Sequence, residues 1–491
     1  MTPAPPRTDR GRLLLVLALV TVVTVFTATV PLLRDWFDLR VYHGTIDSWV
    51  HHGGRIYDYR VPGTVYGFTY PPFAAVVMLP MALLDLHTAI AAALLLNLAA
   101  LALILRLLAG PAWRRHGWYG WALTACVLAL FEPLRDTFSF GQVNLLLLAL
   151  VLTDAALLAN GRTRWAGIGI GLAAAIKLTP ALFIGLLLVA RRWRAAAVAT
   201  AVALGATALA ASADPDASRF YWTEALWDTN RVGRLGYVSN QSVQGILARL
   251  GEPDRAVWAA VVVLLLGVWA LRARRAVAAG DWMAAFALTG LAACLVSPIT
   301  WVHHLVWLLP SFAVLIRTGR ARIAGTLYAV LCTSVVWLWF DDASGVDGFL
   351  GSNTYAWITL GLLLWLPAGQ QPRTGGPAAA APVRLPPRPV RRHPRSAPLP
   401  SSRTRPPSAR RTRRRAESPR PVGRRPWTRR GNPPVRPGCP PRSPSRAVSG
   451  LPRTPRSRRL PEGSSPSRRG CARRAAPPRR ACCPPCWCSR S

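Results

Sequence analysis

Two carboxylates follow the first long apolar run of the chain, which begins near Leu13. They are Asp35 and Asp38, and an apolar run of this length predicts that they lie at a membrane–water boundary. A carboxylate at such a boundary can serve as a general base that takes a proton from an attacking hydroxyl group. A second interpretation stays open, in which these acids pair with Arg34 or Arg40 at a helix end.

The chain contains one lysine, Lys177, against 59 arginines. It lies between two short apolar segments, just before Pro180. An ammonium group in the middle of a membrane costs about 2.5–3.5 kcal/mol, but near the interface it can bind a phosphate. A lysine that merely extends its amine to the headgroups is the alternative, although arginine would serve that purpose equally well.

His303 and His304 lie in the sequence Trp301-Val-His-His, at the expected start of an apolar span. Either imidazole could bond a phosphate or a sugar hydroxyl, and the alternative is a place in the interfacial belt. A zinc site is not predicted, because no acid or further histidine stands at helical spacing from this pair. No metal or other cofactor is predicted with certainty, and a requirement for a divalent metal stays open.

Four amides are candidates for binding sugar hydroxyls: Gln142, Asn144, Asn240 and Gln241. Helix capping or hydrogen bonding between helices is the alternative role for each of them. Tyr70 joins the candidates for sugar or acceptor binding, although Tyr-Pro-Pro is also a sequence that starts a helix.

These side chains must be positioned by an all-α polytopic membrane protein. The chain is 51% hydrophobic, and its apolar residues gather in spans up to about Pro367. We expect about twelve spans, with residues 72–109 counted as one crossing preceded by an interfacial or re-entrant segment. The expected spans are 13–33, 72–109, 117–131, 141–159, 165–178, 180–190, 194–212, 257–271, 282–297, 304–316, 322–339 and 354–367.

The arginine-rich short loops predict the orientation, because such loops stay in the cytoplasm. Arg7, Arg10 and Arg12 precede the first span, so residues 1–12 are expected inside. Span parity then places the acids, amides and histidines named above at the outer face. Polar groups gathered at one interface favour chemistry there over a transporter, which more often has polar residues in the middle of its spans.

Residues 368–491 have a different composition, rich in proline, arginine and serine, and are predicted to be a disordered cytoplasmic tail. From Gln371 onwards they contain 32 arginines, no lysine and two acids. Most of the formal net charge of +39 therefore belongs to the tail, and it suggests contact with anionic lipid rather than nucleic acid. The abrupt onset of the tail and its terminal cysteine cluster are also typical of a translated frameshift.

An ordered set of motifs resembles the polyprenol-phosphate-mannose-dependent α-(1→2)-mannosyltransferases of glycosyltransferase family 87, a GT-C type group. The resemblance covers residues 10–367. The motifs are Asp38-Leu-Arg-Val-Tyr42, Gly54-Arg-Ile-Tyr57, Tyr70-Pro71-Pro72, Gly141-Gln142-Val-Asn144, Ile176-Lys177-Leu-Thr-Pro180 with Arg191-Arg192-Trp193, Asn240-Gln241-Ser242, and Ser297-Pro298-Ile-Thr-Trp301-Val-His303-His304.

The resemblance implies that residues 13–367 form a GT-C type multi-helix bundle with Asp38 as catalytic base. Lys177, His303 and His304 would bind the donor phosphate. The implied enzyme moves mannose, with inversion, from a polyprenyl phosphate to a phosphatidylinositol mannoside or lipoarabinomannan-type glycolipid, at the outer face of a bacterial plasma membrane. A polyprenyl-phospho-arabinose-dependent arabinofuranosyltransferase and a lipid or glycan transporter are the alternatives.

Overall fold

The computed structural model describes residues 8–29, 34–109, 117–251 and 254–369. This part of the chain is helical, and its one β-bridge joins Arg60 to Gly67. The α-helices are α1 (Asp9–Thr29), α2 (Phe37–His51), α3 (Pro72–Met78), α4 (Leu86–Ala109), α5 (Gly117–Leu130), α6 (Glu132–Phe140), α7 (Asn144–Ala159), α8 (Ile168–Ile176), α9 (Leu182–Val189), α10 (Trp193–Ala213), α11 (Pro215–Phe220), α12 (Val243–Leu250), α13 (Arg255–Ala278), α14 (Trp282–Val296), α15 (Leu309–Arg317), α16 (Ala321–Cys332), α17 (Gly345–Ser352) and α18 (Thr354–Trp365). Short 3₁₀ or π segments are η1 (Leu79–Leu83), η3 (Thr179–Ala181), η4 (Tyr221–Ala225), η5 (Thr229–Arg231), η6 (Val302–Leu308) and η7 (Val335–Trp339).

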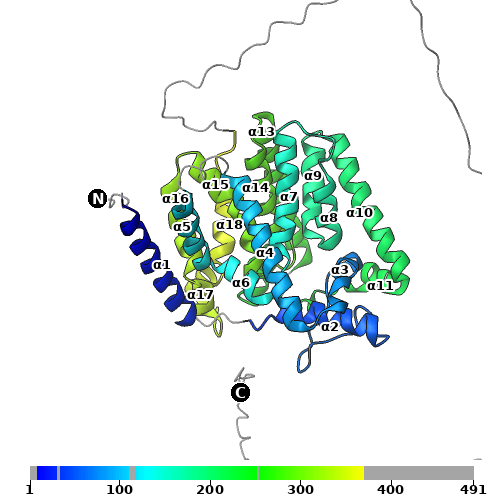
Figure 1. Cartoon of the computed structure of the whole chain (residues 1–491). Coiled ribbons are helices and arrows are strands. Elements are labelled where there is room, and N and C mark those ends of the chain that lie inside the picture. Colours follow the sequence, from blue (N-terminus) through cyan, green and yellow to red (C-terminus); the bar gives the residue numbers. More distant parts are fainter. Residues whose placement is uncertain (1–7, 30–33, 110–116, 252–253, 370–491) are drawn as a thin grey trace, which may run out of the picture. The chain divides into compact units, whose positions relative to one another are not determined.

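Four helices of the described residues are long and apolar enough to cross a membrane: α1, α4, α10 and α13. The bent pair α6 and α7 would make a fifth span, and several shorter apolar helices run beside them (Figure 1). The all-helical membrane fold is therefore confirmed, while the count of about twelve crossings stays a prediction. The predicted disordered tail falls on residues 370–491, which lie outside the described residues.

The ambiguous stretch 72–109 is divided between two kinds of element. Helix α3 and segment η1 together are too short to cross a membrane, whereas α4 alone is long enough. Proline explains where α3 begins, because Pro71 caps the helix and Pro72 occupies its first position, where a missing amide hydrogen costs nothing.

The core of the bundle is built around α14. Its residues are buried along nearly the whole helix, and it packs against α7, α13, α15 and α18. A helix that is apolar on every side is expected at such a central position, because it has no polar face to present to water.

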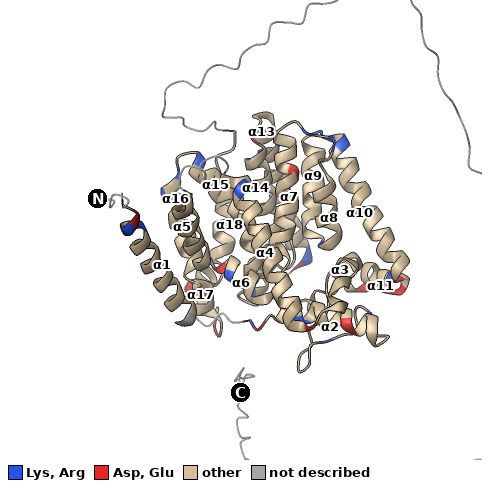
Figure 2. Cartoon of the chain, in the orientation of Figure 1, with Lys and Arg blue, Asp and Glu red and all other residues tan. Residues whose placement is uncertain are grey.

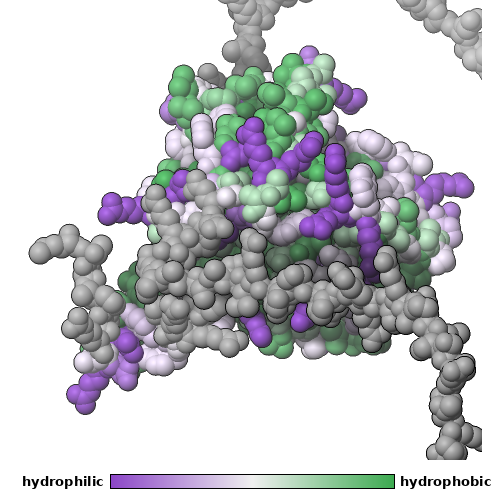
Figure 3. Space-filling view, turned by 90° about the horizontal axis from the view of Figure 1, so that it is seen from above, coloured by the Kyte–Doolittle hydropathy of each residue, from purple (hydrophilic) through white to green (hydrophobic). Residues whose placement is uncertain are grey.

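Charged residues differ between the two ends of the bundle. Arginines lie near the start of α10, the end of α13 and the start of α16 at the upper end of the bundle. Figure 2 shows acidic residues mainly around α2, α11 and α17 at the lower end, with basic residues among them. Figure 3 looks onto the upper end and shows hydrophilic side chains between hydrophobic ones. This distribution has the form that the positive-inside rule describes.

Candidate active site

A strained turn leads into α2, the helix that carries Asp38. Asp35 and Trp36 both have positive φ, at 47° and 52°, a conformation that costs most residues roughly 1–2 kcal/mol. Ser139 at the end of α6 holds this turn with two hydrogen bonds. Its Oγ accepts one from the backbone amide of Arg34 at 2.8 Å, and its carbonyl accepts one from the backbone amide of Trp36 at 3.0 Å. The turn thus fixes the start of α2 against α6.

The same region of α6 ends in Gly141, which allows the chain to bend by 118° into α7. Gly141 has φ 72°, and a Cβ atom there would lie 2.6 Å from Cβ of Leu39. Glycine is therefore required both for the left-handed turn and for the close approach of α2. The result is that Gln142, the next residue, lies beside Asp38.

Asp38 begins a chain of side-chain hydrogen bonds. Gln142 Nε2 donates to Asp38 Oδ2 at 2.6 Å, and Gln142 Oε1 accepts from Tyr70 Oη at 2.8 Å. Tyr42, one turn after Asp38 on α2, donates to Tyr70 Oη at 2.9 Å. Tyr57 donates to the Tyr70 carbonyl at 2.7 Å and fixes its backbone. The carboxylate is therefore held in one orientation by residues of α2, the loop before α3 and the α6–α7 bend.

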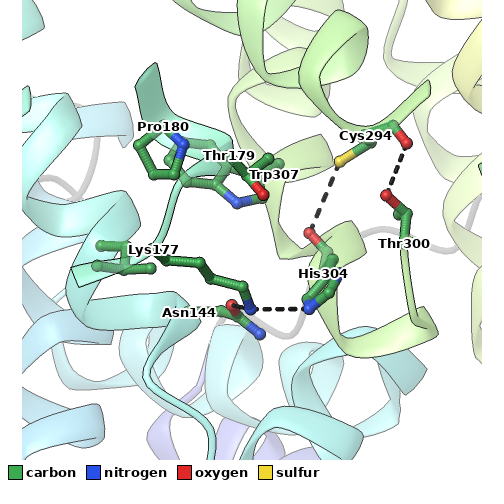
Figure 4. Close-up of a pocket in the computed structure, with 9 residues that line it drawn as sticks. Asn144, Lys177, Thr179, Pro180, Cys294, Thr300, His304 and Trp307 are labelled. Atoms are coloured by element: carbon green, nitrogen blue, oxygen red, sulfur yellow. Dashed lines mark hydrogen bonds between the residues drawn. The ribbon is translucent and has the colours of Figure 1, made fainter. Parts of the chain in front are cut away.

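Lys177 stands at the other end of this chain. Helix α8 ends at Ile176 because Pro180 follows, and Lys177 itself has extended dihedrals of φ −146° and ψ 133°. Its Nζ lies 3.2 Å from Tyr70 Oη, 3.0 Å from Asn144 Oδ1 and 2.8 Å from His304 Nε2. Figure 4 shows Lys177, Asn144 and His304 converging on a small cavity that Pro180 and Trp307 also line.

His304 presents a proton towards Lys177. The Trp301 amide donates to His304 Nδ1 at 3.1 Å, so a neutral imidazole carries its hydrogen on Nε2. When Lys177 is an ammonium, two donors therefore face each other across 2.8 Å. Because 2.8 Å leaves no room for an atom between the two nitrogens, an anion could accept from both only from the side on which they line the cavity.

Asp38 is partly buried, and no basic residue of the described part of the chain forms an ion pair with it. Desolvation raises its pKa to about 6, against the opposing effects of the Gln142 hydrogen bond and the Lys177 charge. The alternative of pairing with an arginine holds for Asp35, which lies 2.8 Å from Arg40, whereas Arg34 lies 3.6 Å from Asp136. A carboxylate with this pKa can accept a proton near neutral pH.

The remaining histidine candidate has a different environment. His303 is only 3% exposed, and its ring centroid lies 5.1 Å from that of Phe140 and 4.7 Å from that of His304. Neither ring nitrogen has a hydrogen-bond partner in the described part of the chain. The His303 carbonyl accepts from Thr137 at 3.2 Å, so its backbone contributes to the packing of η6 on α6.

The structure places Asn240 and Gln241 outside this network. Asn240 bonds the carbonyls of Leu235 and Pro298 and the amide of Thr300. Gln241 bonds the carbonyls of Val238 and Ser352 and the amide of Ala356. Both side chains are fully buried and bond backbone groups, as the structural alternative predicts, and sugar binding by them stays a prediction.

Sequence reasoning did not identify Tyr42 as a site residue, although the spacing contains the signal. Asp38 and Tyr42 are four residues apart on α2, so their side chains lie on the same helix face. No cluster of three or more His, Cys, Asp or Glu side chains that could bind a metal is found among the described residues.

Comparison with known proteins identifies the family of this chain. The model of glycosyltransferase family 87 matches residues 68–298. A polyprenol-phosphate-mannose-dependent alpha-(1-2)-phosphatidylinositol pentamannoside mannosyltransferase of Mycobacterium tuberculosis (strain CDC 1551 / Oshkosh) is 34% identical over 356 residues, which are 69% of this chain and 81% of that protein. The chain belongs to glycosyltransferase family 87.

Other relatives of this family 87 chain have similar names. A polyprenol-phosphate-mannose-dependent alpha-(1-2)-phosphatidylinositol mannoside mannosyltransferase of Mycobacterium tuberculosis (strain H37Rv) is 35% identical over 308 residues, covering 58% of this chain and 71% of that protein. A pentamannoside mannosyltransferase of Mycolicibacterium smegmatis is 35% identical over 337 residues, covering 66% and 80%. No solved structure matches. The chain is thus a glycosyltransferase in a helical membrane scaffold.

Proposed function

We propose that this family 87 glycosyltransferase moves mannose from a polyprenyl phosphate to a hydroxyl group of a lipid-anchored glycan. The observation that carries the proposal is the hydrogen-bonded chain that joins the Asp38 carboxylate, through Gln142 and Tyr70, to the Lys177 ammonium. A base and a cation at opposite ends of one polar chain suit an acceptor hydroxyl and a departing phosphate. The names of the relatives support the donor and an acceptor of the phosphatidylinositol mannoside type.

The proposed reaction is a direct displacement. Asp38 takes the proton of the acceptor hydroxyl while that oxygen attacks the anomeric carbon of the donor sugar. The bond between this carbon and the phosphate oxygen breaks, and polyprenyl phosphate leaves with the electron pair. Attack from the face opposite the leaving group inverts the anomeric configuration, as the family resemblance implies.

The phosphate is assigned to the place beside Lys177 and His304, where the cavity of about 10 Å³ must widen to admit it. The phosphate gains charge as the sugar departs, and fixed cationic or N–H donors at that place stabilise the transition state. The opposed donors of Lys177 Nζ and His304 Nε2 support this assignment. His303, packed against His304 and without a ring partner in the described residues, remains a proposed contributor to the same subsite.

Gln142, Asn144 and Tyr70 are proposed to bind sugar hydroxyls as well as to align Asp38 and Lys177. Each has a polar group in the network at 2.6–3.4 Å from another member. Asn240 instead supports the site indirectly, because it holds Pro298 and Thr300 in the segment that leads to His304.

The site is proposed to face the outside of a bacterial plasma membrane. Helix α2 lies at the end of the bundle where acidic residues gather, opposite the arginines near α10, α13 and α16 (Figure 2). Because arginine-rich loops remain in the cytoplasm, this arrangement supports an outward-facing Asp38.

The decisive experiment is transfer from radiolabelled polyprenyl-phosphate-mannose in membranes that contain the wild type or Asp38→Asn. Loss of a general base predicts a decrease of about 10²–10⁴-fold. Asp35→Asn is the matched control, because Asp35 is exposed and pairs with Arg40, and it should transfer at nearly the wild-type rate.

Undiminished transfer by Asp38→Asn would exclude Asp38 as base. If the protein transfers sugar only from a polyprenyl-phospho-arabinose donor, the transferred sugar is arabinose and the mannose assignment is wrong. If neither donor supports transfer, and the protein transports a lipid or glycan even as Asp38→Asn, the proposal of an enzyme is wrong and a transporter is indicated.

A further inference from the structure

A second, larger cavity lies away from Lys177. It has a volume of about 490 Å³ and is formed by α1, α4, α5 and α6 together with Trp36. We refer to it as the α4–α5–α6 groove, and its wall includes Leu98, Leu101, Ala129, Leu134 and Phe138. Cavities of this size with a mostly apolar lining are typical of small-molecule sites.

The groove has a polar end. Ser139 and Arg135 line it beside Trp36. The Arg135 guanidinium donates to Ser334 Oγ at 3.1 Å and lies 4.8 Å from the Phe26 ring centroid. Its Nε has no hydrogen-bond partner in the described part of the chain. An apolar channel with a cation at one end fits an amphiphile whose head carries a negative charge.

The polar end touches the segment that carries the base. Trp36 and Ser139 line the groove, and Ser139 also holds the amides of Arg34 and Trp36 in the turn before Asp38. The small cavity at Lys177 is lined by other residues, and the two cavities share none. Along the site the order is therefore groove, Asp38, Gln142, Tyr70 and Lys177.

This order is the one that a displacement between two lipid-linked substrates requires. The nucleophile and the leaving phosphate must approach the anomeric carbon from opposite sides. A lipid that enters on the side of the base brings the hydroxyl, and a lipid that enters on the side of Lys177 brings the phosphate. Resting on the function proposed above, we infer that the α4–α5–α6 groove binds the hydrocarbon chain of the acceptor glycolipid, with Arg135 near its anionic headgroup.

The test narrows the groove with Ala129→Trp on α5. Two acceptors with the same mannosyl headgroup are compared, one with two long acyl chains and one with a short alkyl chain, at a fixed saturating concentration of polyprenyl-phosphate-mannose. We expect KM for the long-chain acceptor to rise about tenfold, which corresponds to ~1.4 kcal/mol. Transfer to the short-chain acceptor should keep its wild-type KM and kcat. The matched control is Ala201→Trp on the exposed surface of α10, which should change neither.

A rise in KM for the polyprenyl donor instead would assign the groove to the donor chain and overturn the inference. Unchanged KM values for both substrates would also overturn it, since the groove would then hold ordinary bilayer lipid only. Should Ala129→Trp fail to fold, the wild type decides: an acceptor with a diazirine on its acyl chain should label peptides of α4 and α5, and labelling elsewhere only would refute the assignment. Failure of the wild type to use either acceptor would refute the proposed function rather than the groove.

Discussion

At the scale of single residues, the environment of Asp38 determines its chemistry. Burial disfavours its charged form, while one amide donor and the Lys177 ammonium favour it, and burial has the larger effect. Asp35, three residues earlier, is exposed and pairs with Arg40. Two aspartates three residues apart therefore differ in what they can do, and the burial of Asp38 makes the difference.

The raised pKa of Asp38, about 6, predicts the pH dependence of transfer. A general base works only when it is deprotonated, so kcat/KM should be constant above this pKa and fall roughly tenfold per pH unit below it. This acidic limb of the pH profile is measured by initial rates between about pH 5 and 8 with polyprenyl-phosphate-mannose as donor. A rate that stays constant through this range would contradict the assignment.

Gln142→Ala should move that limb to higher pH. The Gln142 hydrogen bond lowers the pKa of Asp38, so its removal leaves the desolvation of the carboxylate less opposed. Asn160→Ala is the matched control, because the Asn160 amide bonds only a carbonyl of its own helix at 2.7 Å. An unshifted limb in Gln142→Ala would show that another group titrates.

At the scale of elements, breaks in helices position the site. The α6–α7 bend at Gly141 brings Gln142 to Asp38, and the end of α8 before Pro180 frees Lys177 from the helix. The breaks therefore bring together residues of the proposed site that come from distant parts of the chain.

Gly141→Ala tests the bend. The added methyl would lie 2.6 Å from Cβ of Leu39 in a left-handed conformation that itself costs about 1–2 kcal/mol. We expect lower thermal stability and strongly reduced transfer, because α2 must move away from α6 and carry Asp38 with it. Unfolding temperature in detergent and transfer rate are the two measurements.

Gly205→Ala is the control for that substitution. Gly205 lies within α10, and nothing stands within 4 Å of a Cβ atom there. Alanine is the better helix former by roughly 0.5–1 kcal/mol, so this variant should be as stable as the wild type or more so, with unchanged transfer. Equal effects of the two substitutions would show that the Gly141 bend has no special role.

At the scale of the whole molecule, the segregation of charge between the ends of the bundle predicts its orientation. Val65, in the loop before α3, is 76% exposed at the end that carries Asp38, while Ala279 is exposed beside the arginines at the end of α13. In a chain truncated after Gly369, we expect a membrane-impermeant maleimide to label Val65→Cys in intact cells and Ala279→Cys only after lysis. The truncated chain without either substitution gives the background of its own cysteines.

The opposite labelling pattern would invert the orientation and place Asp38 in the cytoplasm. The truncated chain should also keep its transferase activity, since the described polar network lies within residues 38–304. Lost activity, with normal membrane insertion, would show that residues 370–491 have a role in the reaction.

The sequence by itself determined which segments are apolar, that a helix begins at Pro72 and that one ends before Pro180, and which polar residues are candidates for the site. These signals are local: a proline or glycine acts on its own turn, and hydropathy is read over a single helix. Residue type and motif alone indicate Asp38, Tyr70, Gln142, Asn144, Lys177 and His304, and the hydrogen-bonded network contains each of them.

Only the tertiary structure separated Gln142 and Asn144 from Asn240 and Gln241, which are the same residue types in equally suggestive motifs. The physical reason is distance along the chain. Asp38 and Gln142 are 104 residues apart, and Lys177 and His304 are 127 apart, so their contacts depend on how apolar helices pack rather than on local sequence. Packing likewise paired Arg34 with Asp136 and formed the groove between α4, α5 and α6, because the sequence of a uniformly apolar helix does not indicate which face it will bury.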